Sequence, residues 1–594
     1  MLQACTNAVG LSAAAALRTD RIPWAAVTSP AESTTVPPLR TQVRDAVARA
    51  WQRAVATGTL PETDATATLP AVDLDRPSHP EHGDFASSLA LKLARPYRRA
   101  PLDIAAAIAG EIAAEASAGT GSSPIASVEV AAPGFLNLRL TDAALAAAVG
   151  AVLADPTGWG RVPAIRRRRV NVEFVSANPT GPLTIGNARG AFVGDLLCRV
   201  LEAGGQTVTR EYYFNDSGAQ VSNLGASVLA VRRGEPIPDD GYHGAYVEDL
   251  AGQLPDDILA AAQAPGGDAP DVVGRWAAAH VREGIEASLE RLGVHFDVWK
   301  SEGSLHSEGW VERAVERLKA GGHVYEQDGA LWFRSTAFGD DKDRVVIRSD
   351  GRTTYFAADI GYVTEKLSRG FDHLIYIWGA DHHGTVARLR NAATAMGYDA
   401  ATVQVLLYSW VRFIRDGQEI SMSKRAGEFI TLDELLAEVG VDAARWFFAS
   451  RAATTGIDFD IELAKKQSAD NPVYYVQYAH ARIASILRKA GDVGIAPASR
   501  VDDMLGGAPE AALARAIARF PEVVEDAATS EETHGVTAYA TALATEFHAF
   551  YRDARVVDEN EPERSAGRLA LVSAARVTLA SALALLGISA PDSR

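Results

Sequence analysis

The sequence is poor in cysteine, with only Cys5 and Cys198 among its 594 residues. Two thiols are too few for a disulfide framework or a four-cysteine zinc site, and so low a content suits a reducing cytoplasm. Long apolar runs are lacking too, because charges break stretches such as "LSAAAALRTD" well short of the ~20 residues that a membrane span needs. The first residues carry no early positive charge and make a poor signal peptide. We therefore expect a cytoplasmic protein that is not anchored in a membrane.

Positive charge is also scarce. The 58 lysine and arginine residues are outnumbered by 75 aspartate and glutamate residues, which gives a net charge of −17 at pH 7. Such a surplus repels polyanions and argues against indiscriminate nucleic-acid binding, while leaving room for a local basic surface. The candidate for that surface is the run "RRRR" at residues 166–169, for which a solvated linker is the alternative interpretation.

Composition divides the chain into four segments, within the two to four domains that its length predicts. Residues 1–38 are expected to be a flexible extension. Residues 39–142 combine a helical period with the strand pair "IASVEVAAPGFLNLRL", which indicates a small α+β domain. Strand-like and helical runs alternate over residues 160–466, with an insertion near residues 235–345, and this predicts a parallel sheet. Residues 467–594 are almost wholly helical in pattern and predict a bundle.

Three apolar runs in the alternating segment have the composition of strands: "RVNVEFV", "HLIYIWGA" and "VQVLLYSWVRFI". We expect the second and third to be buried strands. In the C-terminal segment, "AALARAIARFPEVVEDAA" and "RLALVSAARVTLASALALLG" have the periodicity of bundle helices.

The stretch "EFVSANPTGPLTIGNARG" reads as a strand, a loop and a helix. Pro179, Gly181 and Pro182 prevent a helix until about Gly186. At Gly186 the missing side chain lets backbone N–H groups approach a phosphate, and the positive end of the helix dipole faces the same point. This predicts a site for a nucleoside triphosphate, although many strand–helix turns of similar composition bind nothing.

The stretch "ISMSKRAGEFITLDELL" contains a short basic loop before a helix. Thr431 and Glu434 match the capping box that opens a helix. Lys424 and Arg425 could clamp the charge that develops on a transferring phosphate, and a solvated basic loop is the alternative.

Together the two stretches resemble the signatures of class I aminoacyl-tRNA synthetases. "TIGN" at residues 184–187 corresponds to the "HIGH" tetrad, and "SMSKR" at residues 421–425 to "KMSKS". The stretches "REYYFNDSGAQ", "TTYFAADIGYVTEK", "WGADHHGTVARL" and "NPVYYVQYAHAR" are similar to bacterial arginyl-tRNA synthetases, in order, over about residues 39–591.

This resemblance implies a multidomain α/β fold. A Rossmann-like catalytic sheet would lie between an N-terminal α+β domain that contacts tRNA and a C-terminal all-α anticodon-binding bundle. It also implies a ligase that activates L-arginine with ATP and Mg²⁺ to arginyl-adenylate. The ligase would then transfer arginine to the 3′-terminal adenosine of tRNA(Arg), releasing AMP and pyrophosphate. A monomer is expected.

The resemblance also assigns the arginine site residue by residue. Asp359 would bind the guanidinium group, with Tyr355 one helical turn before it. Glu302 is a second, weaker candidate for the same group. Glu173 and Asn178 would hold the α-amino and carboxylate groups of the amino acid.

Further roles follow for the nucleotide and the tRNA. The catalytic candidates come from the two signatures: Thr184, Gly186, Asn187, Lys424 and Arg425. The ATP-binding candidates add the turn after "HLIYI": Gly186, Asn187, Gly379, Asp381, His382, Met422 and Lys424. Tyr475 and Tyr478 would stack on anticodon bases, with a role in the bundle core as the alternative. No protein metal site is expected, since no third ligand is spaced near His382 and His383.

The sequence departs from the family pattern at Asn187, which remains a donor and is acceptable among class I relatives, and at three further positions. Thr184 replaces a histidine that donates a hydrogen bond to phosphate, and loss of one such donor typically costs ~10²–10³-fold in rate. Ser421 replaces the first lysine of the loop, and Lys300 stands where an aromatic residue is expected. Because the residues assigned to arginine are all present, we favour an active synthetase. A divergent second copy of the enzyme in its organism is one form that this interpretation allows. The alternative is an impaired or repurposed paralogue that binds tRNA or activates an arginine-like substrate.

Overall fold

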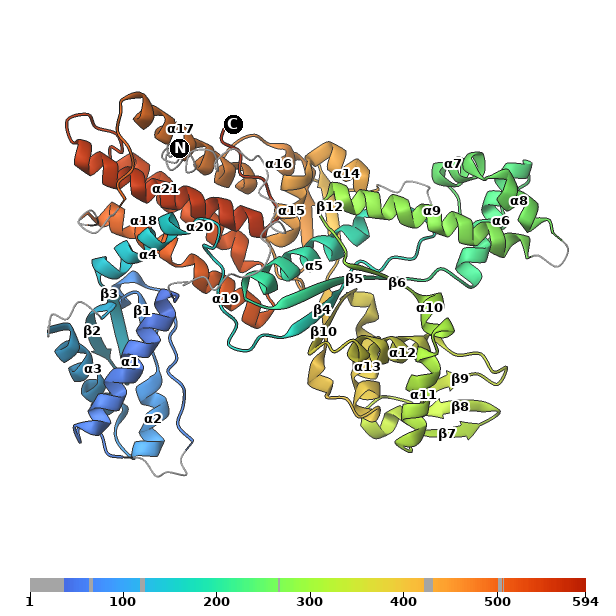
Figure 1. The fold of residues 1–594 in the computed structure, drawn as a ribbon, viewed down its shortest axis with the longest axis horizontal. Coiled ribbons are helices and arrows are strands. Elements are labelled where there is room, and N and C mark those ends of the chain that lie inside the picture. Colours follow the sequence, from blue (N-terminus) through green and yellow to red (C-terminus); the bar gives the residue numbers. More distant parts are fainter. Residues whose placement is uncertain are drawn as a thin grey trace, which may run out of the picture.

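A five-stranded parallel sheet forms the centre of the protein (Figure 1). Its strands lie in the order β11–β10–β4–β5–β6, and every neighbouring pair is parallel. Their bounds are β4 Arg169–Glu173, β5 Thr207–Phe214, β6 Val298–Ser301, β10 His373–Gly379 and β11 Val403–Tyr408. The computed structural model describes residues 37–62, 68–117, 123–264, 268–420, 431–499, 505 and 507–593. The predicted multidomain α/β fold with a Rossmann-like sheet is confirmed.

The order of the strands places a binding edge between β4 and β10. The chain runs outward from β4 through β5 and β6, then returns to the other side of β4 to form β10 and β11. In open parallel sheets, ligands bind outside the carboxyl ends of the strands where the order reverses in this way. Glu173 ends β4 and Gly379 ends β10, so the residues that follow these two strands lie at the expected binding edge.

Helix α5 (Ile185–Ala203) follows β4 and is buried along most of its length. A Cβ atom at Gly194 would lie 2.3 Å from the ring of Phe174, so a larger residue would push the helix away from the sheet. The helices that pack on α5 come from later parts of the chain: α14 (Leu432–Val439), α15 (Val441–Ala449) and α19 (Phe520–Ser530). Helix α5 is therefore held from several sides.

The run "VQVLLYSWVRFI" does not form one strand, contrary to expectation. It contains β11 of the central sheet and β12 (Val411–Arg415), which pairs with β13 (Gln418–Glu419) and β14 (Ile457–Asp460) in a separate sheet. The chain leaves the central sheet at Ser409, whose N–H donates to the carbonyl oxygen of Ala453. Apolar periodicity continues through this break because the strands on either side of it both bury side chains.

The N-terminal domain is the expected α+β unit. Its antiparallel sheet has the order β1–β3–β2, in which β2 (Ile125–Ala131) and β3 (Phe135–Leu140) are the predicted pair. The edge strand β1 (Phe85–Ser87) has only three residues and gave no sequence signal. Three helices pack here: α1 (Leu39–Ala56), α2 (Leu89–Tyr97) and α3 (Pro101–Ser117).

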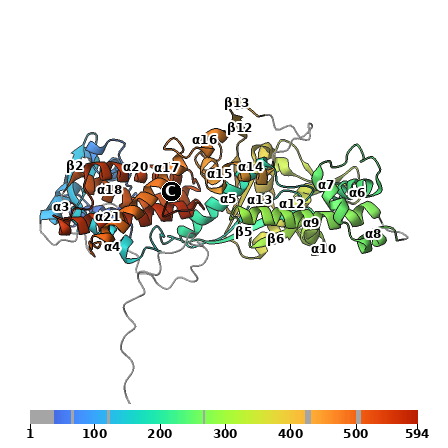
Figure 2. The ribbon, with the colours of Figure 1, turned by 90° about the horizontal axis from the view of Figure 1, so that it is seen from above.

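Two groups of elements extend from the central sheet. The first contains α6 (Ala219–Arg233), α7 (Ala245–Gln253), α8 (Asp256–Ala262) and the long α9 (Ala269–Arg291), which packs along α6. The second contains α10 (Glu302–Ser307), α11 (Trp310–Ala320), α12 (Tyr355–Ser368), α13 (His383–Ala395) and the sheet β7–β8–β9 (Val324–Gln327, Ala330–Phe333, Arg344–Ile347). Figure 2 shows an elongated molecule with α7 and α8 at one end and the N-terminal domain at the other.

The C-terminal segment is a helix bundle, as predicted. It comprises α17 (Pro472–Asp492), α18 (Ala508–Ala518), α19, α20 (Gly535–Asp553) and α21 (Pro562–Leu585), and α4 (Asp142–Ala154) packs on α18 and α21. The run "AALARAIARFPEVVEDAA" is divided between α18 and α19 next to Pro521. Helix α21 is long and apolar enough to span a membrane, but 61% of its most apolar window is buried inside the protein, as in a core helix.

Candidate active site

The first turn of α5 carries the tetrad at residues 184–187. Thr184 is the N-cap residue, and its backbone N–H (3.1 Å) and hydroxyl (3.0 Å) both donate to Oδ1 of Asn187. This orients the amide so that Nδ2 of Asn187 can donate to another group. Gly186 is exposed and has no side chain to block the helix end. Backbone N–H groups, the helix dipole and one amide therefore converge at a point suited to an anion.

The end of the second signature loop lies beside this turn. The N–H of Leu432 donates to the carbonyl oxygen of Leu183 at 3.0 Å, and Thr184 forms an antiparallel bridge with Thr431. Thr431 and Glu434 form the predicted capping box. The predicted residues of the loop itself lie outside the described residues: Met422, Lys424 and Arg425. Segments about 240 residues apart in the sequence thus meet at the tetrad.

Arg189, one turn further along α5, supports the same region. Its guanidinium donates to four backbone carbonyl oxygens, those of Ser409, Trp410, Ala452 and Thr455, at 2.6–3.1 Å. No carboxylate within the described part of the chain pairs with it, and burial lowers the pKa of Arg189 to about 10. Arg189 therefore anchors the break between β11 and β12, and it places a buried positive charge behind the tetrad.

The end of β10 contributes a short exposed turn. Gly379 closes the strand, and Asp381 and His382 follow in a 3₁₀ turn (Ala380–His382). A Cβ atom at Gly379 would lie 2.4 Å from Oδ1 of Asp381, so a larger residue would displace that carboxylate. His382 lies 3.6 Å from Asp381 and contacts the ring of Trp378. The strand order places this turn at the same edge of the sheet as α5.

Carboxylates from three elements gather near the carboxyl end of β4. Asp359 projects from the first turns of α12, Glu302 begins α10 and Glu173 ends β4; these three residues are the carboxylate cluster. Burial, with the charges of Glu173 and Glu302, raises the pKa of Asp359 to about 7. Burial also raises the pKa of Glu302, whose carboxylate accepts a hydrogen bond of 2.9 Å from the Tyr213 hydroxyl. The cluster is therefore a strongly negative site that favours a cation.

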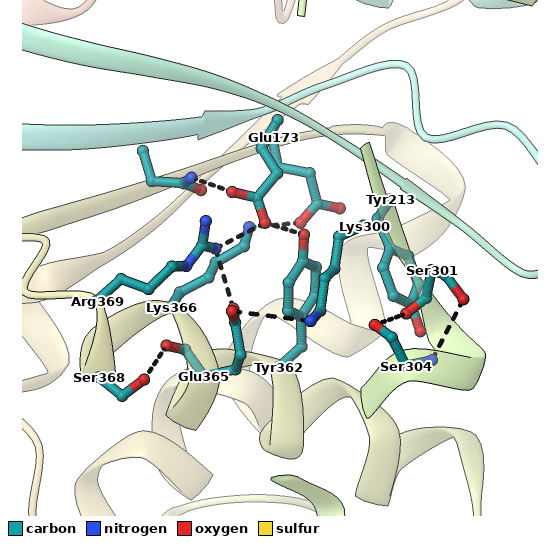
Figure 3. A network of polar contacts seen from close by, with 12 residues as sticks. Glu173, Tyr213, Lys300, Ser301, Ser304, Tyr362, Glu365, Lys366, Ser368 and Arg369 are labelled. Atoms are coloured by element: carbon teal, nitrogen blue, oxygen red, sulfur yellow. Dashed lines mark hydrogen bonds and ion pairs between the residues drawn. The ribbon is translucent and has the colours of Figure 1, made fainter. Parts of the chain in front are cut away.

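Glu173 differs from the other two carboxylates because it already has a cationic partner. Nζ of Lys366 lies 2.6 Å from its Oε2 (Figure 3). The Ser176 hydroxyl donates to Oε1 of Glu173 at 3.2 Å. Lys366 is fully buried. No lysine or arginine of the described chain forms an ion pair with Asp359 or Glu302. The unmatched charge of the cluster therefore resides on Asp359 and Glu302.

The pair formed by Glu173 and Lys366 belongs to a larger buried network, drawn in Figure 3. Arg369 lies 2.8 Å from Glu211 and 3.0 Å from Glu365, and Lys300 lies 3.9 Å from Glu365. Tyr362 donates its hydroxyl to Glu211 and stacks on Tyr213. Within this network the cations Lys300, Lys366 and Arg369 match the carboxylates Glu173, Glu211 and Glu365. The charge of Lys300, unexpected from the sequence, thus has a partner.

The remaining residues predicted for arginine are more exposed. Asn178 lies in the loop after β4 and donates to Oε1 of Gln220 on α6 at 2.7 Å. Tyr355 begins α12 and is 66% exposed. Tyr355 and Asp359 lie one turn apart on α12. Asp359 is close to Glu173 at the end of β4, and Gly379 ends the neighbouring strand β10, so candidates for arginine and for ATP lie at the same end of the sheet.

Known proteins share this arrangement over almost the whole chain. Family models match in three places: an arginyl tRNA synthetase N terminal domain over residues 39–140, a class I (R) tRNA synthetase catalytic domain over 269–454 and a DALR anticodon binding domain over 476–593. The arginine–tRNA ligase of Citrifermentans bemidjiense is 42% identical over 567 residues, covering 93% of this chain and 100% of that protein. The chain belongs to the arginyl-tRNA synthetase family.

Two further comparisons agree with this family. The arginine–tRNA ligase of a Geobacter species is 43% identical over 565 residues, covering 93% of this chain and all of that protein. The arginyl-tRNA synthetase of Thermus thermophilus superposes with a TM-score of 0.71 over 94% of this chain, and at 24% identity it supports the fold alone. As a member of the arginyl-tRNA synthetase family, the chain is an arginine–tRNA ligase that uses ATP and binds tRNA(Arg) through its DALR domain.

The synthetase's bundle presents an aromatic and cationic surface that includes both predicted tyrosines. Tyr475 and Tyr478 are half-buried on α17, and both rings contact His548 of α20. The guanidinium of Arg482 lies 5.2 Å from the centre of the Tyr478 ring and 4.7 Å from that of Tyr551, which is 38% exposed. One part of each tyrosine packs in the bundle, while another part stays accessible.

Sequence reasoning missed several residues of this synthetase's site, notably Tyr213, Lys366 and Arg189. Lys366 lies seven residues after Asp359 on α12, a spacing that places both on one helix face and could have suggested a shared site. Arg189 lies directly after "TIGNA", but nothing in the sequence shows that its partners are carbonyl groups. Tyr213 lies within "REYYFND", where alternation predicts a strand and no particular partner.

Proposed function

We propose that Asp359 and Glu302 bind the guanidinium group of arginine in the ligase reaction. The observation that carries this assignment is the unmatched negative charge of the carboxylate cluster. A guanidinium presents a planar fork of N–H donors that suits carboxylates, and burial strengthens the attraction. Glu173 was expected to hold the α-amino or carboxylate group of arginine. Because Lys366 neutralises it, we propose instead that Glu173 and Lys366 line the site without binding the charged groups of the substrate.

The test compares Asp359→Asn with Glu308→Gln. Glu308 is a surface carboxylate that pairs with Lys300 outside the cluster. We expect Asp359→Asn to raise KM for arginine by about 10²-fold or more, because a charged hydrogen bond contributes about 1.5–3 kcal/mol and the buried guanidinium loses its counter-charge. Glu308→Gln should change KM for arginine by no more than about twofold. Equal KM values for both variants would exclude the assignment.

We further propose that the first turn of α5 binds the phosphates of ATP. The carboxylate of arginine attacks the α-phosphorus, and the bond to the bridging oxygen of pyrophosphate breaks. Negative charge grows on the departing pyrophosphate, where Nδ2 of Asn187, the exposed N–H groups near Gly186 and the helix dipole stabilise it. Lys424 and Arg425 would add positive charge from the loop that ends beside Thr184. Gly379 and Asp381 would hold the ribose, with His382 next to the nucleotide.

Magnesium fits this assignment as a companion of the triphosphate. Mg²⁺ is usually held by phosphate oxygens, waters and one or two carboxylates, and it neutralises phosphate charge during transfer. Over the described residues, no three His, Cys, Asp or Glu side chains are grouped as a metal site. The phosphates of ATP would therefore supply most of its ligands.

Transfer completes the reaction when a hydroxyl of the terminal adenosine attacks the carbonyl carbon of arginyl-adenylate and AMP leaves. We propose that Tyr475, Tyr478 and Arg482 contact the anticodon, since stacking on aromatic faces suits unpaired bases. The exposed Phe135 at the start of β3 would contact a more distant part of the tRNA. We expect a monomeric enzyme of the cytoplasm, which sedimentation and cell fractionation would test.

A further inference from the structure

A buried cluster of two arginines and one aspartate joins α5 to the ends of two other helices. Asp195 lies on α5, and its Oδ2 accepts hydrogen bonds from Arg199 at 2.8 Å and from Arg445 of α15 at 2.7 Å. Asp195 and Arg445 are almost wholly buried. Burial alone would raise the pKa of Asp195, but the guanidinium groups of Arg199 and Arg445, together with the more distant charge of Arg210, lower it to about 2. The cluster is therefore charged at every physiological pH.

The other donors of both arginines bind the carboxyl ends of α9 and α21. Arg445 donates to the carbonyl oxygens of Leu292 (2.7 and 3.0 Å) and Leu586 (3.1 Å), which are the C-cap residues of α9 and α21. Arg199 also reaches both helix ends, through the carbonyl oxygens of Gly293 (3.1 Å) and Ala584 (3.3 Å). Carbonyls at helix C-termini carry partial negative charge and lack partners within the helix, so they attract guanidinium groups.

The two helices end in the same way, with Leu followed by a left-handed glycine. Gly293 has φ +69° and Gly587 has φ +69°. A Cβ atom at Gly587 would lie 2.2 Å from Nη1 of Arg445, so only glycine admits the guanidinium at this point. Past Gly587, Ser589 is held by Asp442 at the start of α15, which also accepts from Gln477 of α17. The bundle is thereby fastened to the helices around α5.

Helix α5 connects this cluster to the phosphate-binding turn. Asp195 lies eight residues after Asn187, about 12 Å along the helix axis. A helix that is buried on most sides moves as a rigid body, so a shift at Asp195 also displaces Asn187. We propose that Arg199 and Arg445 are positioning residues that couple the anticodon-binding bundle to α5 and so set the placement of its phosphate-binding turn. This inference rests on the proposed binding of ATP at that turn.

The test compares Arg199→Gln with Arg210→Gln. Both arginines have side chains that are 14% exposed and both pair with a carboxylate of α5, but Arg210 pairs with Glu202 and binds neither α9 nor α21. The full-length enzyme would be assayed for arginine-dependent ATP–pyrophosphate exchange with tRNA present. Hydrogen exchange at residues 184–190, the melting temperature and tRNA affinity would be measured alongside.

We expect Arg199→Gln to lower kcat by about tenfold, since displacements of the order of 1 Å at a reacting centre cost up to about 10²-fold. KM for arginine and the Kd for tRNA should stay within about twofold, and hydrogen exchange at residues 184–190 should rise. Arg210→Gln should lower the melting temperature to a similar degree while kcat stays within about twofold.

A purely structural role would lower kcat and stability in both variants alike, and that result would overturn the inference, as would an unchanged kcat in Arg199→Gln. Should Arg199→Gln fail to fold, Arg199→Lys retains the charge and one bond to Asp195 and should lose part of the kcat with the same rise in hydrogen exchange. Lack of exchange activity in the unmodified enzyme would instead refute the proposed function, and the inference with it.

Discussion

The hydroxyl of Thr184 lies 3.0 Å from Oδ1 of Asn187 and donates its hydrogen to that oxygen. The residue that departs most clearly from the family tetrad is thus engaged with the last residue of the same tetrad. Since the backbone N–H of Thr184 donates to the same atom, the amide of Asn187 has one orientation, with Nδ2 directed to other partners. In the proposed site Thr184 would act on the phosphate through Asn187, so that a threonine at this position would be compatible with an active enzyme.

Removing this hydroxyl should slow activation moderately. Thr184→Val keeps the shape of the side chain but loses the bond to Asn187, and we expect kcat for ATP–pyrophosphate exchange to fall by about tenfold. Asn187→Ala removes the donor itself and should cost ~10²–10³-fold. Thr184→Ser, which keeps the hydroxyl, is the control and should retain most of the activity. A Thr184→Val enzyme as fast as the unmodified one would contradict this role.

Arginine binding should weaken as pH falls below about 7. The pKa of Asp359 is raised from its ordinary 3.8 to about 7 by burial and by Glu173 and Glu302. The guanidinium requires the ionised carboxylate, so below pH 7 KM for arginine should rise by up to tenfold per pH unit. KM for ATP should change much less, and the rise should disappear in Asp359→Asn.

The same pKa shift should make the folded protein less stable as pH rises, whereas it should make arginine binding stronger. Between about pH 4 and pH 7 the native state holds a proton on Asp359 that the unfolded chain has released. The stabilisation of the folded state by this proton is therefore fully present below pH 4 and is lost as pH rises to 7. The substrate-free enzyme should gain stability from Asp359→Asn at pH 8, measured by thermal unfolding, and a destabilised variant would disprove the assignment.

Breaking the pair between Lys366 and Glu173 should destabilise the fold strongly. Lys366→Met leaves Glu173 buried without its cation, which typically costs about 3–5 kcal/mol of unfolding free energy. Lys465, an exposed lysine that pairs with Glu438, offers the control, and Lys465→Met should cost less than about 1 kcal/mol. Adding Glu173→Gln to Lys366→Met should recover part of the stability in chemical denaturation. An additive double variant would show that the two residues do not interact.

Tyr478 should contribute to tRNA affinity rather than to catalysis. Loss of a stacked base costs about 1–3 kcal/mol, so Tyr478→Ala should weaken tRNA(Arg) binding by about 5- to 150-fold and leave KM for ATP unchanged. Tyr539 is a buried tyrosine of the same bundle whose hydroxyl donates to the carbonyl oxygen of Ala516. Tyr539→Phe should lower the melting temperature and leave tRNA affinity intact. If Tyr478→Ala lost stability but kept its affinity for tRNA, the role of Tyr478 would be packing in the bundle core and not tRNA binding.

Local patterns predicted those parts of the fold that depend on neighbouring residues. Apolar runs predicted the parallel sheet, and Thr431 with Glu434 predicted a helix start that the structure confirms. Pairings between distant residues could not be predicted, because Lys366 and Glu173 lie 193 residues apart and meet only through the fold. The break at Ser409 was missed for the same reason, since Arg189 and Ala453 hold it from elsewhere.

The bonds between Arg199 and the end of α21 also bear on how the chain folds during synthesis. The carbonyl of Ala584 leaves the ribosome 385 residues after Arg199. Large chains usually fold one domain at a time from the N-terminus, but here helix α5 obtains its last supports only when α21 is complete. The nucleotide-binding core would therefore stay unfinished through most of translation and mature together with the anticodon-binding bundle, so that a nascent chain interrupted before α21 would carry no assembled site for ATP.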